Sequence, residues 1–168
     1  MSWVDWLSLA VVLGVAIIQT IRTSKAGGMG LTLVEMFGVV ASAVAATSFA
    51  PALARGLRIT TSVTLVVLFI GFALLGFIFA RWFFGVTQWS FESLDGFLGF
   101  VFGFVTGWAV AHMILRIMIE SQGIQGPIAL SVSSGPIARE VFYFKTWNAL
   151  MQLLFKVRLG PQINPDLG

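Results

Sequence analysis

The fold is decided by residues 95–107, which read Asp95-Gly-Phe-Leu-Gly99-Phe-Val-Phe-Gly103-Phe-Val-Thr-Gly107. An acidic residue opens this apolar run, and glycine then recurs at every fourth position. On an α-helix this spacing places Gly99, Gly103 and Gly107 along one narrow face, where the backbone of another helix can approach closely. Small residues at this spacing are typical of helices that pack inside a membrane. The stretch therefore predicts a membrane-spanning helix that carries a glycine seam, defined here as these three glycines.

The composition indicates the same class of protein. Of the 168 residues, 58% are hydrophobic and 10% are charged, against about 25% charged residues in soluble domains. A water-soluble domain of this size has no means of hiding so much apolar surface. The net charge is +3, but the ten lysines and arginines are scattered in ones and twos between apolar runs. This pattern is typical of charges that flank membrane spans, and it argues against nucleic acid as a partner, which calls for a clustered basic stripe.

Four apolar runs are each close to the roughly 20 residues that cross the hydrocarbon core of a bilayer. They predict an all-α, polytopic membrane protein whose domain of four transmembrane helices occupies residues 1–121, with spans at 3–21, 31–53, 60–84 and 97–119. Two matches to the capping-box pattern support the helix starts, one from Ser2 to Asp5 and one from Thr32 to Glu35. The loops between the spans are short, and residues 51–59 are expected to form the second of them.

The composition changes after the fourth span. Residues 122–136 are rich in glycine, serine and proline and are expected to form a flexible linker. An amphipathic helix is expected at 137–158, followed by a mobile tail at 159–168. Lys145 and Lys156 belong to the polar stripe of that helix, which either lies in the membrane surface with its lysines toward lipid head groups or packs against the bundle with its polar face in water.

The basic residues that flank the spans bear on orientation. Arg22, Lys25 and Arg81 fall on one side of the predicted membrane, and the other side holds Arg55 and Arg58 together with the basic residues after residue 136. The positive-inside rule weights charges near the span ends most heavily, and there the two sides are almost balanced. The remaining excess favours a topology with both termini in the cytoplasm.

Ionisable residues within membrane spans are candidates for function. His112 and Arg116 lie one helical turn apart on one face of the fourth span, and with Glu35 or Asp95 as a partner they form a candidate proton-handling group. Arg116 lies near the end of its span, and both acidic residues are expected in the first turn of a helix, where the helix dipole favours them. A structural role for His112, in packing and hydrogen bonding, is therefore the favoured reading, and a role in proton handling is the alternative.

The glycine seam also has two readings. Its three glycines either accommodate a neighbouring span of the same chain or form the contact of a homo-oligomer. The first is favoured, because four spans already offer neighbours within one chain.

The sequence argues against an enzyme. It contains one histidine and no cysteine, so the usual metal-ligand and cysteine-nucleophile patterns are missing, and no phosphate-binding loop is found. We therefore expect no catalytic residues, no metal site and no cofactor. The expected partners are the lipid bilayer and other membrane proteins, with a homo-oligomer as a further option.

Several features resemble the colicin V production protein family of bacterial inner-membrane proteins. The first span is led by Asp5, and the second carries Glu35 and Gly38 after a turn that contains Arg22 and three glycines. The fourth span opens with Asp95 and the glycine seam, and Ser134-Gly135-Pro136 is similar to the segment that follows the last span in the family. The resemblance implies a multi-pass protein of the bacterial inner membrane, linked to bacteriocin production or export and to envelope maintenance. It implies no catalytic residues.

The expected function is thus that of a non-catalytic membrane component in export or envelope maintenance. The alternative is a small oligomeric channel, or a proton or solute transporter subunit, in which His112 and Arg116 line a polar path.

Overall fold

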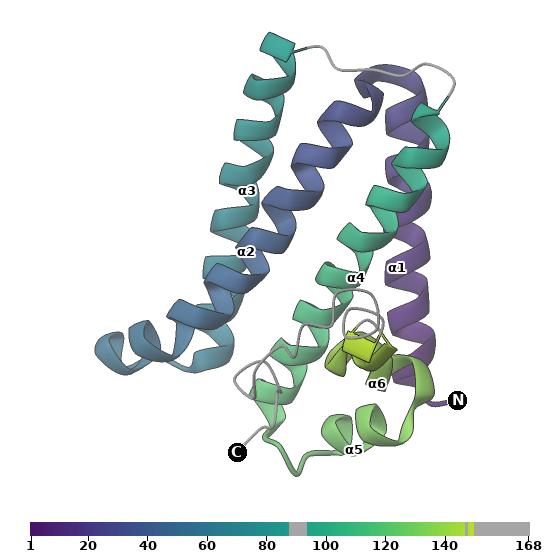
Figure 1. Cartoon of the computed structure of the whole chain (residues 1–168). Helices are drawn as coiled ribbons and strands as arrows, with labels where there is room; N and C mark the ends of the chain where they lie inside the picture. The colour runs from purple at the N-terminus through teal and green to yellow at the C-terminus, as the bar shows by residue number, and fades with distance from the viewer. Residues whose placement is uncertain (88–93, 147, 150–168) are drawn as a thin grey trace.

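The computed structural model describes residues 1–87, 94–146 and 148–149, and over these ranges the chain is helical without strands. In the described residues, four long helices lie side by side and two short helices pack at one end of the bundle (Figure 1). The elements in chain order are α1 (Trp3–Arg22), the π-helical turn η1 (Thr23–Gly27), α2 (Gly28–Leu57), α3 (Thr61–Thr87), α4 (Asp95–Gln122), α5 (Pro127–Ser134) and α6 (Pro136–Tyr143).

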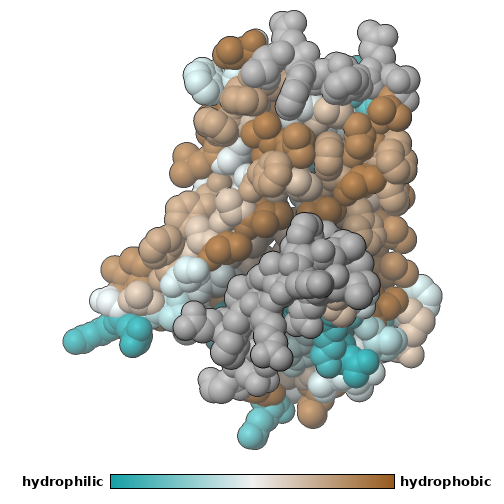
Figure 2. All heavy atoms as spheres, viewed as in Figure 1, coloured by the Kyte–Doolittle hydropathy of each residue, from teal (hydrophilic) through white to brown (hydrophobic). Residues whose placement is uncertain are grey.

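The four long helices confirm the predicted all-α, polytopic membrane architecture. Each is long and apolar enough to cross a membrane, and the predicted spans agree with the observed helices to within a few residues. Figure 2 shows hydrophobic residues along the sides of the bundle and hydrophilic ones gathered at its lower end, around the α2–α3 turn and the short helices. This division is the one expected of a protein whose long helices face lipid and whose ends face water.

One of the two predicted capping boxes is present. Ser2 caps α1: its hydroxyl accepts a hydrogen bond from the Asp5 amide, and the Asp5 carboxylate accepts one from the Ser2 amide. The prediction for the second span was wrong, because α2 begins at Gly28 and Thr32 and Glu35 lie inside the helix.

The α2–α3 connection is shorter than expected. The segment 51–59 was expected to be a loop, but α2 continues through Pro51 to Leu57, and the turn to α3 occupies the next three residues. A proline inside a membrane helix leaves one carbonyl without its usual helical partner, which membrane helices tolerate.

The long helices pack as two pairs, α1 with α4 and α2 with α3, and α2 also packs against α4. Buried apolar side chains of α1, α4, α5 and α6 form one core, and a second core joins α2, α3 and α4. Helix α3 lies at the outside of the bundle (Figure 1). It exposes large apolar side chains along its length, among them Val63, Val67, Ile70, Leu74, Ile78 and Trp82.

The segment expected to be a flexible linker contains helix α5. Pro127 occupies its first turn, and Ile128 and Val132 are buried on one face. The hydroxyls of Ser131 and Ser133 donate to carbonyls one turn earlier in the helix. The linker interpretation rested on composition and overlooked the apolar pair at i and i+4, which is the pattern of a helix that buries one face.

The predicted helix over 137–158 is interrupted. Helix α6 ends at Tyr143, and Phe144 adopts a left-handed conformation with φ of 53°. Helix α6 packs against α1 and α4. The choice between the surface-lying and the bundle-packed alternative for the whole of 137–158 stays a prediction, because most of the polar stripe follows α6 in the chain. Lys145 is exposed and lies 5.8 Å from the centre of the Tyr143 ring. Residue 147, residues 150–158 of the predicted helix with Lys156, and the tail at 159–168 lie outside the described residues.

Candidate functional site

The glycine seam packs against α1 of the same chain. A Cβ atom built on Gly103 would lie 2.9 Å from the Ala16 Cα, and one built on Gly107 would lie 2.7 Å from the Val12 carbonyl oxygen. At Gly99 the added atom would meet the Thr23 side chain instead. Real side chains do not tolerate such distances, so these positions accept glycine alone at the observed helix separation. The glycine seam thus accommodates a neighbouring segment of the same chain, as the favoured interpretation expected.

A partly buried ion pair joins the end of α1 to α2. The Arg22 guanidinium donates to both carboxylate oxygens of Glu35, at 2.9 and 3.1 Å, and the Gln19 amide donates to the same carboxylate at 3.0 Å. The Glu35 side chain is fully buried, whereas that of Arg22 is 42% exposed. Glu35 lies two turns inside α2, so its charge is balanced by the ion pair and not by the helix dipole that was expected to favour it.

Asp95 ties the start of α4 to the start of α2. Its carboxylate accepts a hydrogen bond from the Met29 amide at 3.0 Å. That amide belongs to the first turn of α2, where no carbonyl of the helix is available to it. Close by, the hydroxyls of Thr23 and Thr32 form a hydrogen bond between η1 and α2. Both contacts hold the α1–α2 connection against the rest of the bundle.

Asp5 makes an equivalent tie at the opposite end of α1. One carboxylate oxygen accepts hydrogen bonds from the amides of Ile137 and Ala138, at 3.0 and 2.8 Å. The carboxylate thus satisfies two free amides at the start of α6, where the helix dipole favours a negative charge. It is completely buried. A Cβ on Gly135 would lie 2.5 Å from it, so glycine is required at that position for α6 to approach.

His112 lies against the segment that contains α6. Its Nδ1 atom is 3.4 Å from the Val141 carbonyl oxygen, and its ring stacks on Phe142 with 5.4 Å between centroids. The Phe144 ring packs against it as well, at 5.1 Å. Arg116 follows one turn later on α4, and within the described part of the chain its buried Nε atom has no hydrogen-bond partner.

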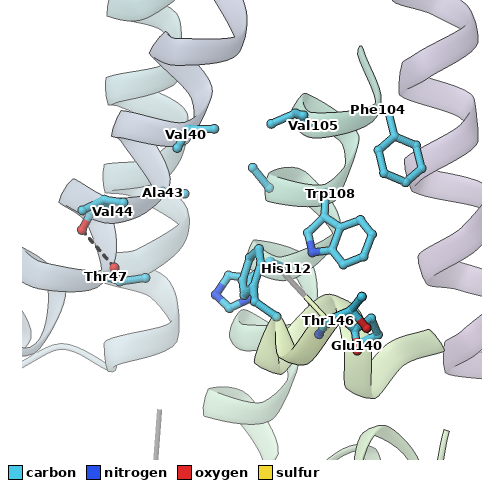
Figure 3. Close-up of a pocket in the computed structure, with 12 residues that line it drawn as sticks. Val40, Ala43, Val44, Thr47, Phe104, Val105, Trp108, His112, Glu140 and Thr146 are labelled. Carbon is cyan, nitrogen blue, oxygen red and sulfur yellow. Dashed lines mark hydrogen bonds between the residues drawn. The ribbon is translucent and has the colours of Figure 1, made fainter. Parts of the chain in front are cut away.

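His112 also lines a cavity of about 620 Å³ between α2 and α4. The side chains of the cavity wall are mainly apolar. Figure 3 shows the His112 ring pointing from α4 toward Thr47 on α2, with Trp108 one turn above it. Glu140 and Thr146 line the cavity at the same end as His112.

The structure does not bring the four candidate proton-handling residues together. Asp95 and His112 are the first and eighteenth residues of α4, which separates them by about 25 Å along the helix axis. Glu35 is bonded to the C-terminal turn of α1, whereas His112 contacts the α6 segment at the other end of the bundle. A relay in which Glu35 or Asp95 serves His112 is therefore not assembled in this structure.

Sequence reasoning missed three of the contacts that organise the site. It did not pair Arg22 with Glu35, although these opposite charges lie on either side of the short connection between the first two spans and could have indicated the pair. It did not connect Asp5 with α6, for which the glycine-proline pair at 135–136 was the available clue. It also missed a crossing of α2 and α3 at which Gly38 and Gly76 meet backbone to backbone, with a built Cβ about 3.2 Å from the opposite Cα.

Comparison of the chain with known protein families, curated proteins and solved structures finds no match in any of the three. The resemblance to colicin V production proteins thus stays a prediction from the motifs.

Proposed function

We propose that this chain is a non-catalytic membrane component that holds partner proteins in a bacterial export or envelope-maintenance system, as the resemblance to colicin V production proteins implies. The observation that carries the proposal is that the buried acidic residues hold helices together. Asp5, Glu35 and Asp95 each bind a group on another helical element. Their carboxylates are structural ties, which supports a scaffold more than a reaction centre.

The outer helix α3 supports the same proposal. It contributes few buried residues to the bundle, and large apolar side chains cover its remaining surface. In a membrane such a face contacts lipid or another transmembrane helix, and van der Waals packing against a partner suits it. We therefore infer that partner proteins dock on α3.

Photo-crosslinking in native membranes tests this assignment. A photoreactive amino acid at Val67 or Leu74, both exposed on α3, should yield discrete protein adducts that mass spectrometry identifies. The matched control is the same amino acid at Ile17, which is exposed on α1. Adducts with a consistent set of export or envelope proteins at the α3 positions alone support the proposal. Exclusive crosslinking to lipid at both α3 positions contradicts it.

The proposed location is the bacterial inner membrane with both termini in the cytoplasm. The N-terminus, the α2–α3 turn, α5 and α6 lie at one end of the bundle, and η1 lies at the other (Figure 1). The end with the N-terminus carries Arg55, Arg58, Arg139 and Lys145, which supports placing it inside. Single cysteines at Thr60 and Ser133 should react with an impermeant thiol reagent only from the cytoplasmic side, and one at Ser24 only from the outside.

A channel or transporter subunit is the second candidate, and one observation favours it: His112 lines a cavity within the bundle. Vesicles that contain the purified protein decide between the two functions. A proton or solute flux that His112→Ala abolishes and Arg55→Gln preserves would establish transport. The scaffold proposal expects no flux above that of empty vesicles.

A further inference from the structure

We propose that the cavity between α2 and α4 is a binding site for one acyl chain of a membrane phospholipid. This inference is independent of the proposed function, because it rests on the cavity and its position in the bundle.

The cavity has the size and lining of a site for an apolar ligand. Its volume of about 620 Å³ falls inside the range of roughly 300 to 1,000 Å³ that is typical of small-molecule sites. Its upper wall is formed by aliphatic and aromatic side chains, with Val40 and Val44 on α2 across from Val105 on α4, and Phe104 of α4 also lines it (Figure 3). Hydrocarbon fits such a wall, whereas water would leave its hydrogen bonds unmade there.

The polar groups of the cavity are gathered at one end. Thr47 on α2, His112 on α4, and Glu140 and Thr146 farther along the chain all lie in the lower part of the cavity in Figure 3, toward the end of the bundle that carries α5 and α6. The indole nitrogen of Trp108 is buried without an acceptor among the described residues, and Figure 3 shows it on the side of the ring that faces α2. A donor in that position favours an occupant that carries an oxygen acceptor. A phospholipid has this combination, because its apolar acyl chain is attached through an ester group whose oxygens accept hydrogen bonds.

The position of the cavity identifies the bilayer as the source of the occupant. Both of its main walls belong to membrane spans, and Val44 in the α2 wall is 61% exposed. The cavity is thus reached through the side of the bundle, where lipid is the surrounding medium. An acyl chain can enter sideways while its head group stays at the membrane surface near the polar end.

Photolabelling of the full-length protein tests the proposal. The protein is reconstituted in vesicles of phosphatidylethanolamine and phosphatidylglycerol that contain increasing amounts of a phosphatidylethanolamine with a diazirine in its acyl chain. Labelled peptides are quantified after irradiation. Peptides from the cavity walls of α2 and α4 should reach saturation at a low fraction of the labelled lipid. Peptides from the exposed face of α3 serve as the reference for bulk lipid, and their labelling should rise in proportion to that fraction.

A pair of matched variants locates the label. Val44→Trp fills the cavity from its rim and should lower labelling of the cavity walls about tenfold, the change that corresponds to 1.4 kcal/mol of binding free energy. Val67→Trp makes the same substitution at an equally exposed valine of α3, at 63% exposure, and should leave wall labelling unchanged. If Val44→Trp does not fold, Val40→Trp replaces it, with the thermal unfolding midpoint as the criterion of folding.

Two results would overturn the inference. Wall labelling that rises in proportion with the α3 reference and ignores Val44→Trp would mean ordinary contact with bulk lipid. Walls that remain unlabelled while α3 is labelled would mean that another occupant, such as the chain's own C-terminal residues or a second copy, fills the space.

Discussion

The α1–α4 pair and the α2–α3 pair are built on different principles. Gly103 and Gly107 bring the backbones of α1 and α4 together, and polar ties fasten that pair to α6 at one end and to α2 at the other. The α2–α3 pair meets closely at a single glycine crossing. The polar side chains in the lower half of α2, on Thr47, Ser48 and Arg55, donate to carbonyls of α2 itself.

The difference shows where this bundle has room. Helix α2 is tied to α1 and α4 in its N-terminal part, through Met29 and Glu35. The cavity lies between α2 and α4 at residues 40–47, closer to the C-terminal end of α2. On the α1 side of α4, by contrast, the two backbones pack closely at Gly103 and Gly107. The proposed lipid site is thus found at the boundary between the two pairs, beyond the last polar tie.

The largest expected effect comes from the seam itself. Gly107→Ala places a Cβ against the backbone of Val12, which cannot rotate away, and should cost about 3 kcal/mol, the upper end of the range for overpacked cores. The matched control is Gly71→Ala on α3, where nothing lies within 4 Å of the added atom. The thermal unfolding midpoint in detergent measures both variants. Equal midpoints would show that the α1–α4 contact is no tighter than an exposed helix face.

Removal of the Asp5 carboxylate should release the short helices from the α1–α4 pair. Asp5→Ala deprives two α6 amides of their acceptor and should cost roughly 2 kcal/mol. Hydrogen exchange of residues 127–143 should accelerate. Ser2→Ala is the control, because it removes the cap of α1 without touching α6. Its expected cost is about 1 kcal/mol, and unchanged exchange in Asp5→Ala would refute the tie.

The Arg22–Glu35 ion pair, which joins the two helix pairs, should contribute less to stability than the Asp5 carboxylate. Glu35→Gln removes a buried charge, but Arg22 is partly exposed and can return to water. We expect a loss of roughly 1 to 2 kcal/mol, below the values for fully buried pairs. A double-mutant cycle with Arg22→Gln measures the coupling. Additive losses would mean that the two charges do not stabilise each other.

The smallest effect is expected at the α2–α3 crossing. Gly38→Ala brings a Cβ to 3.2 Å from the Gly76 Cα, a contact that a shift of a few tenths of an ångström relieves. The higher helix propensity of alanine offsets part of the cost, so the net loss should stay below about 1 kcal/mol. Gly56→Ala, where the added atom meets nothing, is the reference. A loss at Gly38 as large as that at Gly107 would remove the distinction between the two pairs.

Much of this fold follows from patterns that extend along single helices. Apolar runs of span length predict α1 to α4, because the bilayer requires about 20 apolar residues whatever the neighbours are. The capping of α1 by Ser2 is equally local, since its partners lie three residues apart. Helix α5 was missed because its serines and proline are typical of loops, although those serines bond within a helix here.

By itself, the sequence determined the class of the protein, the positions of its spans to within a few residues and the need for close packing at the seam, since these depend on composition and on the helical repeat. Only the tertiary structure decided which helix faces Gly103, that Asp5 binds the start of α6, that Arg22 pairs with Glu35, and that His112 borders a cavity. Each of these depends on how separate helices are placed side by side. The repeat of one helix specifies which residues share a face but not what that face meets.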